Sequence, residues 1–261
     1  MASKKIKNKK KQPKRSSAWL RWMLGLFSLG VVAALVGAGT LAGLFFLYGK
    51  DVSLPRITSI RDYQPKAVTR ILDREGLLVG EVFTERRTVV PVARMPKLLI
   101  RAVVAAEDAD FFKHRGLDYL GMLRAFFINL RAGGFVQGGS TITQQVVKTF
   151  FLSPERTIRR KMQEVILARR LENELKKEEI LYLYLNQIYF GHGNYGVQEA
   201  SLYFFNKPVE QLSLSEHALL AGLPQSPNRL SPLRHPERAK KRQTYVLGQM
   251  ARLEFISQDV R

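Results

Sequence analysis

Acidic side chains close an apolar stretch of small residues near the middle of the chain. Glu107, Asp108 and Asp110 end that stretch, and His114 follows four residues after the last of them. A carboxylate at the end of a buried helix can have a raised pKa and act as a general base or acid. The same residues also fit an ordinary solvated helix end, and residue types alone favour this second interpretation.

A second polar cluster, GGSTITQQ, begins at Gly138. Thr141 and Gln144 have the spacing of a capping box, which accounts for both residues without any ligand. Capping does not explain the two glycines or the further polar side chains in the same turn. A helix N-terminus with free N–H groups and nearby hydroxyls also suits a phosphate or a sugar.

Charged side chains recur on one face of the next predicted helix. Arg156, Arg160 and Glu164 follow one another at intervals of four residues, so they share a helical face. They form either a solvated face with a salt bridge or a cationic stripe that binds pyrophosphate. Two more motifs follow: a turn between helices from Asn186 to Gly196, and ALLAGLPQSPN, a helix that ends in a proline-bounded loop.

Taken in series, these segments resemble the five motifs of the peptidoglycan glycosyltransferase family, the lysozyme-like family 51. The matching patterns are EDxxFxxHxG, GxSTITQQ, RKxxE, YLNxxYFGxxxYG and ALLAGLPxxPN, within residues 95–250. Residues 54–92 resemble the N-terminal region of bifunctional class A penicillin-binding proteins. The transpeptidase motifs SxxK and KTG do not occur. The chain is therefore expected to be the N-terminal part of such a protein, with residues 253–261 starting the linker to a further domain.

The resemblance implies an inverting transfer in which the 4-hydroxyl of lipid II attacks a lipid-linked glycan strand. The products are a β-1,4 link and undecaprenyl pyrophosphate. By resemblance, Glu107 is the general base and Glu164 is the second acidic residue of the catalytic site, which places the neighbouring cations or a divalent ion. The implied pyrophosphate-binding cations are Lys148, Arg156, Arg160 and Lys161. The other implied substrate-binding residues are Asp108, Phe111, His114, Ser140, Thr141, Thr143, Gln144, Gln145, Asn186, Tyr189 and Tyr195.

No cofactor or metal site is implied as a requirement, although a divalent cation such as Mg2+ or Mn2+ could take part. The implied partners are lipid II, the lipid-linked glycan strand, membrane lipid, a moenomycin-type inhibitor and other cell-wall synthesis proteins. A lysozyme-like glycoside hydrolase or lytic transglycosylase is the main alternative, because a buried glutamate serves either chemistry. A scaffold or nucleic-acid binder is disfavoured, because the cations cluster beside an acidic motif rather than tracking a phosphate backbone.

Composition leaves several of these functions open. The chain has 261 residues and a formal net charge of +20, which suits nucleic acid, anionic lipid or phosphate substrates. It contains no cysteine, so disulfides, thiolate catalysis and cysteine-based metal sites are excluded. It has no P-loop, and the GxGxxG pattern at residues 191–196 falls between two predicted helices rather than after a predicted strand, so a nucleotide site has no visible signal.

The first element that must position the motifs is a predicted membrane anchor over residues 19–49. Residues 22–49 carry no charge, and a helix of this length exceeds a hydrocarbon core of about 30 Å. A cleaved signal peptide is the alternative, but the apolar run is too long and ends in bulky residues. Residues 1–18 form a basic tail. The positive-inside rule then places the N-terminus in the cytoplasm and everything after residue 50 outside it, in the periplasm.

The rest of the pattern predicts a mainly α fold with one small β-hairpin. A connector and hairpin are expected within residues 50–94, the hairpin over 67–90 with Gly76 in its turn. Residues 95–252 are expected to form a lysozyme-like glycosyltransferase domain. After a first helix near residues 98–106, helices are predicted over 118–131, 140–152, 156–176, 177–189, 194–205, 213–222 and 236–252. Residues 119–131 are apolar on more than one face and, by resemblance, form a jaw that dips into the membrane.

Overall fold

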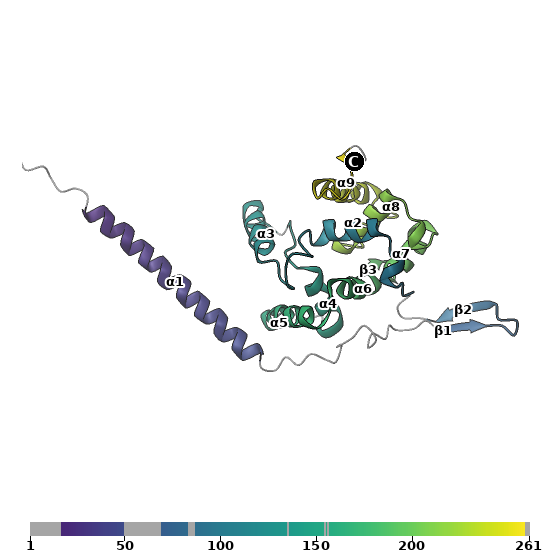
Figure 1. The fold of residues 1–261 in the computed structure, drawn as a ribbon, viewed down its shortest axis with the longest axis horizontal. Coiled ribbons are helices and arrows are strands. Elements are labelled where there is room, and N and C mark those ends of the chain that lie inside the picture. The colour runs from purple at the N-terminus through teal and green to yellow at the C-terminus, as the bar shows by residue number, and fades with distance from the viewer. Residues whose placement is uncertain are drawn as a thin grey trace, which may run out of the picture. The chain divides into compact units, whose positions relative to one another are not determined.

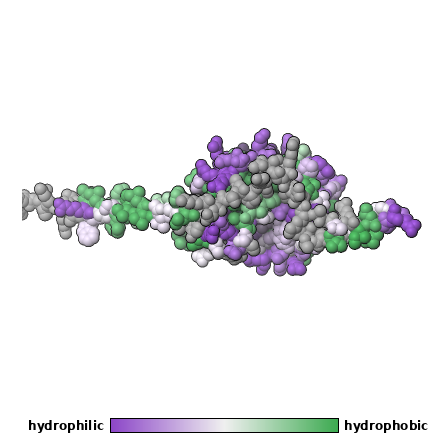
Figure 2. Space-filling view, turned by 90° about the horizontal axis from the view of Figure 1, so that it is seen from below, coloured by the Kyte–Doolittle hydropathy of each residue, from purple (hydrophilic) through white to green (hydrophobic). Residues whose placement is uncertain are grey.

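The computed structural model describes residues 17–49, 69–82, 87–134, 136–153, 155 and 157–258. The chain divides into two compact units, Met1–Lys50 and Asp51–Arg261. The described residues of the first unit form a single helix, α1 (Ser17–Gly49). Much of this helix is green in Figure 2, the colour of hydrophobic residues. Its segment Trp19–Thr40 is long and apolar enough to cross a membrane. A helix is therefore present over the predicted anchor segment, and residues 1–16 of the basic tail lie outside the described residues.

A two-stranded hairpin comes first in the second unit. Strands β1 (Thr69–Leu72) and β2 (Leu78–Val82) pair antiparallel. In the turn, Asp73 Oδ1 accepts hydrogen bonds from the backbone N–H groups of Glu75 and Leu77. Gly76 adopts a φ of 82°, a left-handed conformation that favours glycine. The predicted hairpin and its turn residue are confirmed, although residues 67–68 and 83–86 lie outside the described residues.

The remaining elements are mainly helical, as predicted, and Figure 1 shows most of them. The α-helices are α2 (Lys97–Glu107), α3 (Tyr119–Ala132), α4 (Ile142–Phe151), α5 (Ile158–Glu174), α6 (Lys177–Gln187), α7 (Val197–Phe205), α8 (Leu214–Gly222) and α9 (Pro236–Arg252). The short strands are β3 (Tyr189–Gly191) and β4 (Asn194–Tyr195), and the 3-10 turns are η2 (Val92–Arg94), η3 (Val209–Gln211) and η4 (Leu223–Gln225).

Helix α2 forms the centre of the domain. It contacts α8 and α9, which also pack on each other, while α4 packs on α5 and α6 (Figure 1). Its buried side chains occupy more than one face of the helix, as a central helix requires. They are Leu99, Ala102, Val103, Val104 and Ala105. Because α2 is surrounded, its C-terminal residue Glu107 is delivered into the interior rather than to a solvated helix end.

Two predicted helices are too long because the chain forms a strand pair between them. Residues 177–189 and 194–205 have helical patterns, but α6 ends at Gln187 and α7 begins at Val197. Between them, β3 pairs antiparallel with β4, with Tyr189 opposite Tyr195. The fourth motif is thus a tight β-hairpin held between two helices.

Local capping fixes the start of the helix that carries the second motif. Thr141 caps α4: its side chain accepts from Gln144 N, and Gln144 Oε1 accepts from Thr141 N at 2.9 Å. The predicted capping box is confirmed. Thr141 Oγ1 also donates to Gly116 O at 2.7 Å, which ties the end of the acidic motif to the start of α4.

Gly116 is expected to be intolerant of any side chain. It has a φ of 84°, and an added Cβ would lie 2.8 Å from the backbone oxygen of Ala168 on α5. Left-handed strain and overlap together should lower the free energy of unfolding of Gly116→Ala by about 3 kcal/mol. Gly133→Ala is the matched control. Its φ is 63° with no atom within 4 Å of the added Cβ, so strain alone should cost about 1 kcal/mol. Equal losses in denaturant titrations would contradict a close approach of Gly116 to α5.

Candidate active site

Glu107 is held by a hydrogen bond at one carboxylate oxygen and an ion pair at the other. Gln145 of α4 donates through Nε2 to Oε2 at 2.9 Å, and a guanidinium nitrogen of Arg242 of α9 lies 3.6 Å from Oε1. Only 10% of the Glu107 side chain is exposed. Burial raises the pKa of Glu107, and the charge of Asp108 adds to this, whereas the Gln145 hydrogen bond and Arg242 lower it. The balance leaves the pKa above its ordinary value, as suits a general base or acid.

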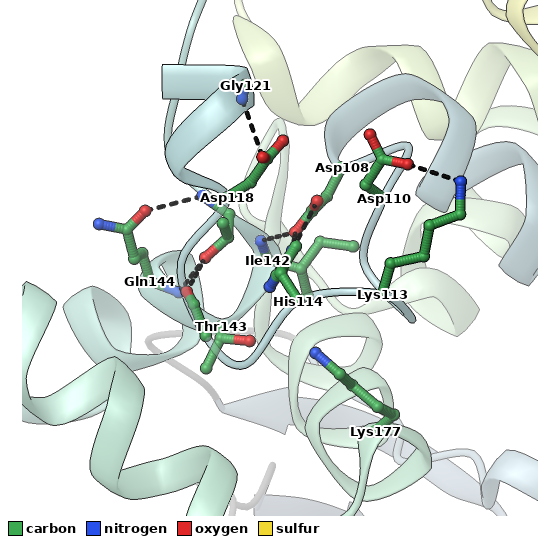
Figure 3. A network of polar contacts seen from close by, with 12 residues as sticks. Asp108, Asp110, Lys113, His114, Asp118, Gly121, Ile142, Thr143, Gln144 and Lys177 are labelled. Atoms are coloured by element: carbon green, nitrogen blue, oxygen red, sulfur yellow. Dashed lines mark hydrogen bonds and ion pairs between the residues drawn. The ribbon is translucent and has the colours of Figure 1, made fainter. Parts of the chain in front are cut away.

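Asp108 fastens the acidic motif to α4 (Figure 3). Its Oδ2 accepts from the backbone N–H of Ile142 at 2.9 Å, and His114 Nε2 lies 3.0 Å from Oδ1. The Asp108 side chain is only 3% exposed. A carboxylate at the first turn of a helix also compensates the positive end of the helix dipole. Asp108 and His114, both predicted to bind substrate, therefore contact each other, and Asp108 holds the helix that carries Gln145.

Phe111 and Thr143 belong to an interior cluster. Thr143 Oγ1 donates to Glu172 Oε1 at 2.5 Å, and Lys177 Nζ reaches the same oxygen at 2.7 Å. The Lys177 ammonium also lies 4.3 Å from the ring centroid of Phe111, which is fully buried. This cluster packs α4, α5 and α6 together, and neither Phe111 nor Thr143 is exposed in it.

Cations surround the second predicted acid. Glu164 on α5 has a 3% exposed side chain, accepts from Arg160 at 3.2 Å and forms a short ion pair with Lys161. Lys161 Nζ also donates to Ser140 Oγ at 3.1 Å and remains 43% exposed. Glu164 thus holds two cations against the loop that precedes α4. The predicted cation Lys148 is exposed on α4, and Arg156 lies outside the described residues.

The predicted residues of the fourth motif divide between the interior and an aromatic pair. Asn186 is fully buried: its Oδ1 accepts from Val90 N at 2.8 Å, and its Nδ2 donates to Val90 O at 3.0 Å. Tyr189 and Tyr195 are half-buried, with ring centroids 4.9 Å apart. The amide of Asn186 therefore pins the chain before α2, while the two tyrosines keep part of their surface in solvent.

Within the described residues, no group of three or more histidine, aspartate or glutamate side chains has the arrangement of a metal site. Glu164 is the acid nearest to such a role, and Arg160 and Lys161 already neutralise it. A cation pair around a single carboxylate disfavours an added divalent ion at that point. Participation of Mg2+ or Mn2+ stays an untested expectation.

Comparison with known proteins bears directly on this arrangement. The family model described as Transglycosylase matches residues 75–251. The chain belongs to the transglycosylase family. Penicillin-binding protein 1A of Rickettsia felis is 42% identical over 231 residues, which cover 87% of this chain and 29% of that protein. Penicillin-binding protein 1F of Bacillus subtilis is 44% identical over 191 residues, which cover 73% and 27%.

A solved structure is also similar. The crystal structure of penicillin-binding protein 1A from Haemophilus influenzae is 27% identical, covers 76% of this chain and 20% of that chain, and superposes with a TM-score of 0.44. The chain spans less than a third of the length of the curated relatives it matches. The resemblance to the glycosyltransferase region of class A penicillin-binding proteins is confirmed at the level of the family.

Two residues of this transglycosylase site were missed in the sequence. Arg242 carries no local signal, because α9 approaches Glu107 only through the packing of α9 on α2. Tyr184 has the spacing of a core residue and is buried, yet its hydroxyl reaches Gln145 Oε1 at 3.5 Å. Only the three-dimensional fold identifies Arg242, whereas Tyr184 is the first residue of the fourth motif and the fold adds its contact with Gln145.

Asp108→Ala should destabilise the transglycosylase domain. It leaves the buried N–H of Ile142 without its acceptor, at a cost of about 1–3 kcal/mol in the free energy of unfolding. Asp108→Asn retains an acceptor oxygen and should lose less. Asp110→Ala is the control, since Asp110 forms only a partly exposed ion pair with Lys113, which contributes less than about 1 kcal/mol. If Asp108→Ala were as stable as Asp110→Ala in urea titrations, the Asp108 carboxylate would not be a structural fastening.

Proposed function

We propose that the protein is a peptidoglycan glycosyltransferase that polymerises lipid II into β-1,4-linked glycan strands. One observation supports this more than any other: α4 carries both a residue that binds the proposed base and a cation that could bind the leaving group. Gln145 on α4 hydrogen bonds to Glu107, and the exposed cation Lys148 lies three residues further on, on the same side of the helix. Lys161, held by Glu164 and by Ser140 at the start of α4, adds a second accessible cation.

In the proposed reaction, the 4-hydroxyl of the acceptor lipid II gives its proton to the Glu107 carboxylate as its oxygen attacks. The new bond forms at the anomeric carbon of the donor strand, and the bond from that carbon to the pyrophosphate breaks. Configuration inverts from α to β, and undecaprenyl pyrophosphate leaves with the bonding electron pair. Lys148, Lys161 and Arg160 would stabilise the negative charge on the leaving group.

The lysozyme-like hydrolase or lytic transglycosylase is the weaker proposal. Those enzymes cleave finished glycan, whose leaving group is a sugar hydroxyl rather than a pyrophosphate. Cations beside the general base serve no need in that chemistry. Lys161, Arg160 and Lys148 therefore favour transfer from a pyrophosphate-linked donor.

The membrane arrangement supports a lipid-linked substrate. We place α1 across the cytoplasmic membrane with the N-terminus in the cytoplasm, because the basic residues precede it and the positive-inside rule then orients the helix. The described domain would then face the periplasm. Helix α3 presents a second apolar surface, and its exposed large side chains are Tyr119, Leu120, Leu123, Phe126, Phe127, Ile128 and Leu130. Such a helix suits the membrane interface, where it would receive the lipid-bearing substrates. A moenomycin-type inhibitor and other cell-wall synthesis proteins are the further partners that we propose.

Glu107→Gln tests the general-base role. The variant keeps the shape of the side chain but cannot accept the proton, so glycan formation from lipid II should fall by about 10²–10⁴-fold. Folding and binding of a moenomycin-type inhibitor should persist, and both are measured on the same preparation. Glu174→Gln, an exposed change on α5, is the matched control and should polymerise normally. Near-normal polymerisation by Glu107→Gln would end the assignment and turn attention to Glu164.

Phe126→Ser/Phe127→Ser tests the membrane role of α3. The two rings are 59% and 58% exposed, so their replacement should leave the fold intact and remove apolar area from the interface. The measurement is liposome binding by a chain that starts at Asp51, the beginning of the second compact unit. Leu233→Ser, at a residue 62% exposed in the loop before α9, is the control. Unchanged liposome binding by the double variant would show that the membrane surface lies elsewhere.

A further inference from the structure

We propose that Arg242 of α9 is a positioning residue for Glu107. Its guanidinium is fixed to the C-terminal ends of α2 and α8, and from there it orients the Glu107 carboxylate. The inference rests on the proposed role of Glu107 as the base. Arg242 lies outside all five sequence motifs, and its side chain is 14% exposed. It approaches Glu107 Oε1 at 3.6 Å from the side of the carboxylate opposite to Gln145.

The guanidinium binds more than the carboxylate. Its Nε donates to Gly222 O at 3.4 Å and one terminal nitrogen donates to Ala106 O at 3.3 Å. Gly222 is the last residue of α8, and Ala106 precedes the last residue of α2. Carbonyls at helix C-termini lack intrahelical donors and carry partial negative charge, so a cation is favoured at both points. The terminal nitrogen that donates to Ala106 O is also the one that lies 3.6 Å from Glu107 Oε1, so the rigid guanidinium meets two carbonyls and the carboxylate together.

Neighbouring residues restrict where the Arg242 side chain can lie. The Tyr245 ring lies 4.7 Å from the guanidinium carbon. On the other side, a Cβ added to Gly222 would lie 2.8 Å from Arg242 Cγ. A glycine at this point of the fifth motif therefore leaves room for the arginine stem. The close approach of Arg242 explains why this position is a glycine. The backbone does not require one, because its φ of −78° is ordinary for a helix.

The opposite side of the carboxylate is fixed by a matching chain of donors. Tyr184 of α6 donates its hydroxyl proton to Gln145 Oε1 at 3.5 Å. This contact orients the amide so that Nε2, and not Oε1, faces Glu107. The carboxylate is thus held from α4 and α6 on one side and from α9 on the other, and each oxygen retains a lone pair for the acceptor proton.

Every charged or titratable group that faces Glu107 can be named. Asp108 on the adjoining residue disfavours its ionised form, and Arg242 on α9 favours it. Tyr184 on α6 stays neutral, because burial and the Glu107 charge raise its pKa well above the ordinary value. Gln145 on α4 does not titrate. Among the described residues, Arg242 is the cation that acts on Glu107, so its loss should raise the pKa of Glu107 and delay ionisation to higher pH.

The test compares Arg242→Gln, Arg242→Lys and Lys241→Gln in the full chain. Lys241 is exposed on the same helix and provides the control. Glycan formation from lipid II is measured across pH, and the carboxylate of Glu107 is titrated by 13C NMR with labelled glutamate, assigned by its absence in Glu107→Gln. For Arg242→Gln we expect the acidic limb of kcat/KM and the Glu107 titration to move up together by about one pH unit or more. Arg242→Lys should restore most of that shift but not the full rate. Lys241→Gln should move neither.

A purely structural role for Arg242 gives a different result. Bracing of the helices alone predicts a rate loss of similar size at every pH with an unmoved Glu107 titration, and this would overturn the proposal. Should Arg242→Gln fail to fold, Gly222→Ala displaces the arginine stem while keeping the charge in the protein, and an unmoved titration in that variant would also overturn it. If the wild type forms no glycan while the titration still shifts, the proposed function fails and the coupling of Arg242 to Glu107 stands.

Discussion

The carboxylate of Glu107 is a charge with little access to water, and its protein neighbours must replace the solvent it has lost. An isolated ion in such a place would neutralise itself by taking up a proton. Here one amide N–H and one guanidinium supply partial compensation from opposite sides. The compensation is incomplete, because the pKa remains raised. A carboxylate in this condition binds a proton more readily than an exposed glutamate does, which suits the proposed proton transfer from a sugar hydroxyl.

This requirement explains why the acidic motif contains two adjacent carboxylates with opposite surroundings. Glu107 ends α2 and faces neutral and cationic donors from α4 and α9, whereas Asp108 leaves the helix and caps the first turn of α4. Asp108 thereby holds in place the helix that brings Gln145 to Glu107. One carboxylate is available for chemistry because the other positions its hydrogen-bond donor. Glu164 differs again, since its two cations keep it fully compensated and leave Lys161 partly exposed.

Local features of the site could be predicted from the sequence, and long-range ones could not. The Thr141–Gln144 capping box and the Gly76 turn depend on neighbours within a few residues, so their residue types sufficed. The predicted helix ends were wrong at the fourth motif. There the pairing of Tyr189 with Tyr195 overrides a helical sequence pattern that continues on both sides of the strands. The contact of Arg242 with Ala106 joins residues 136 positions apart. No spacing rule extends so far, and the basic run around Arg242 is also typical of a solvated helix face. Asn186 is the opposite case: its motif marked it as a substrate-binding residue, but its amide hydrogen bonds to the backbone of Val90.

Helix α3, the proposed interfacial helix, is tied by hydrogen bonds and close packing to the loop that enters α4. Asn129 on α3 accepts from the backbone N–H groups of Val136 and Gln137 at 2.8 Å and donates to Gln137 O at 2.8 Å. Gly139 follows so closely that an added Cβ would lie 3.3 Å from Ala125 Cβ on α3. Ser140 comes next and binds Lys161. If α3 rests in the membrane interface as proposed, its depth would set the height of this loop and of the Lys161 ammonium bound to Ser140. A lipid pyrophosphate is confined to that same level, because its tail stays in hydrocarbon and its charge stays in water. Under the proposed membrane role of α3, anchoring the loop to this helix would match a cation to the depth at which the proposed substrate presents phosphate.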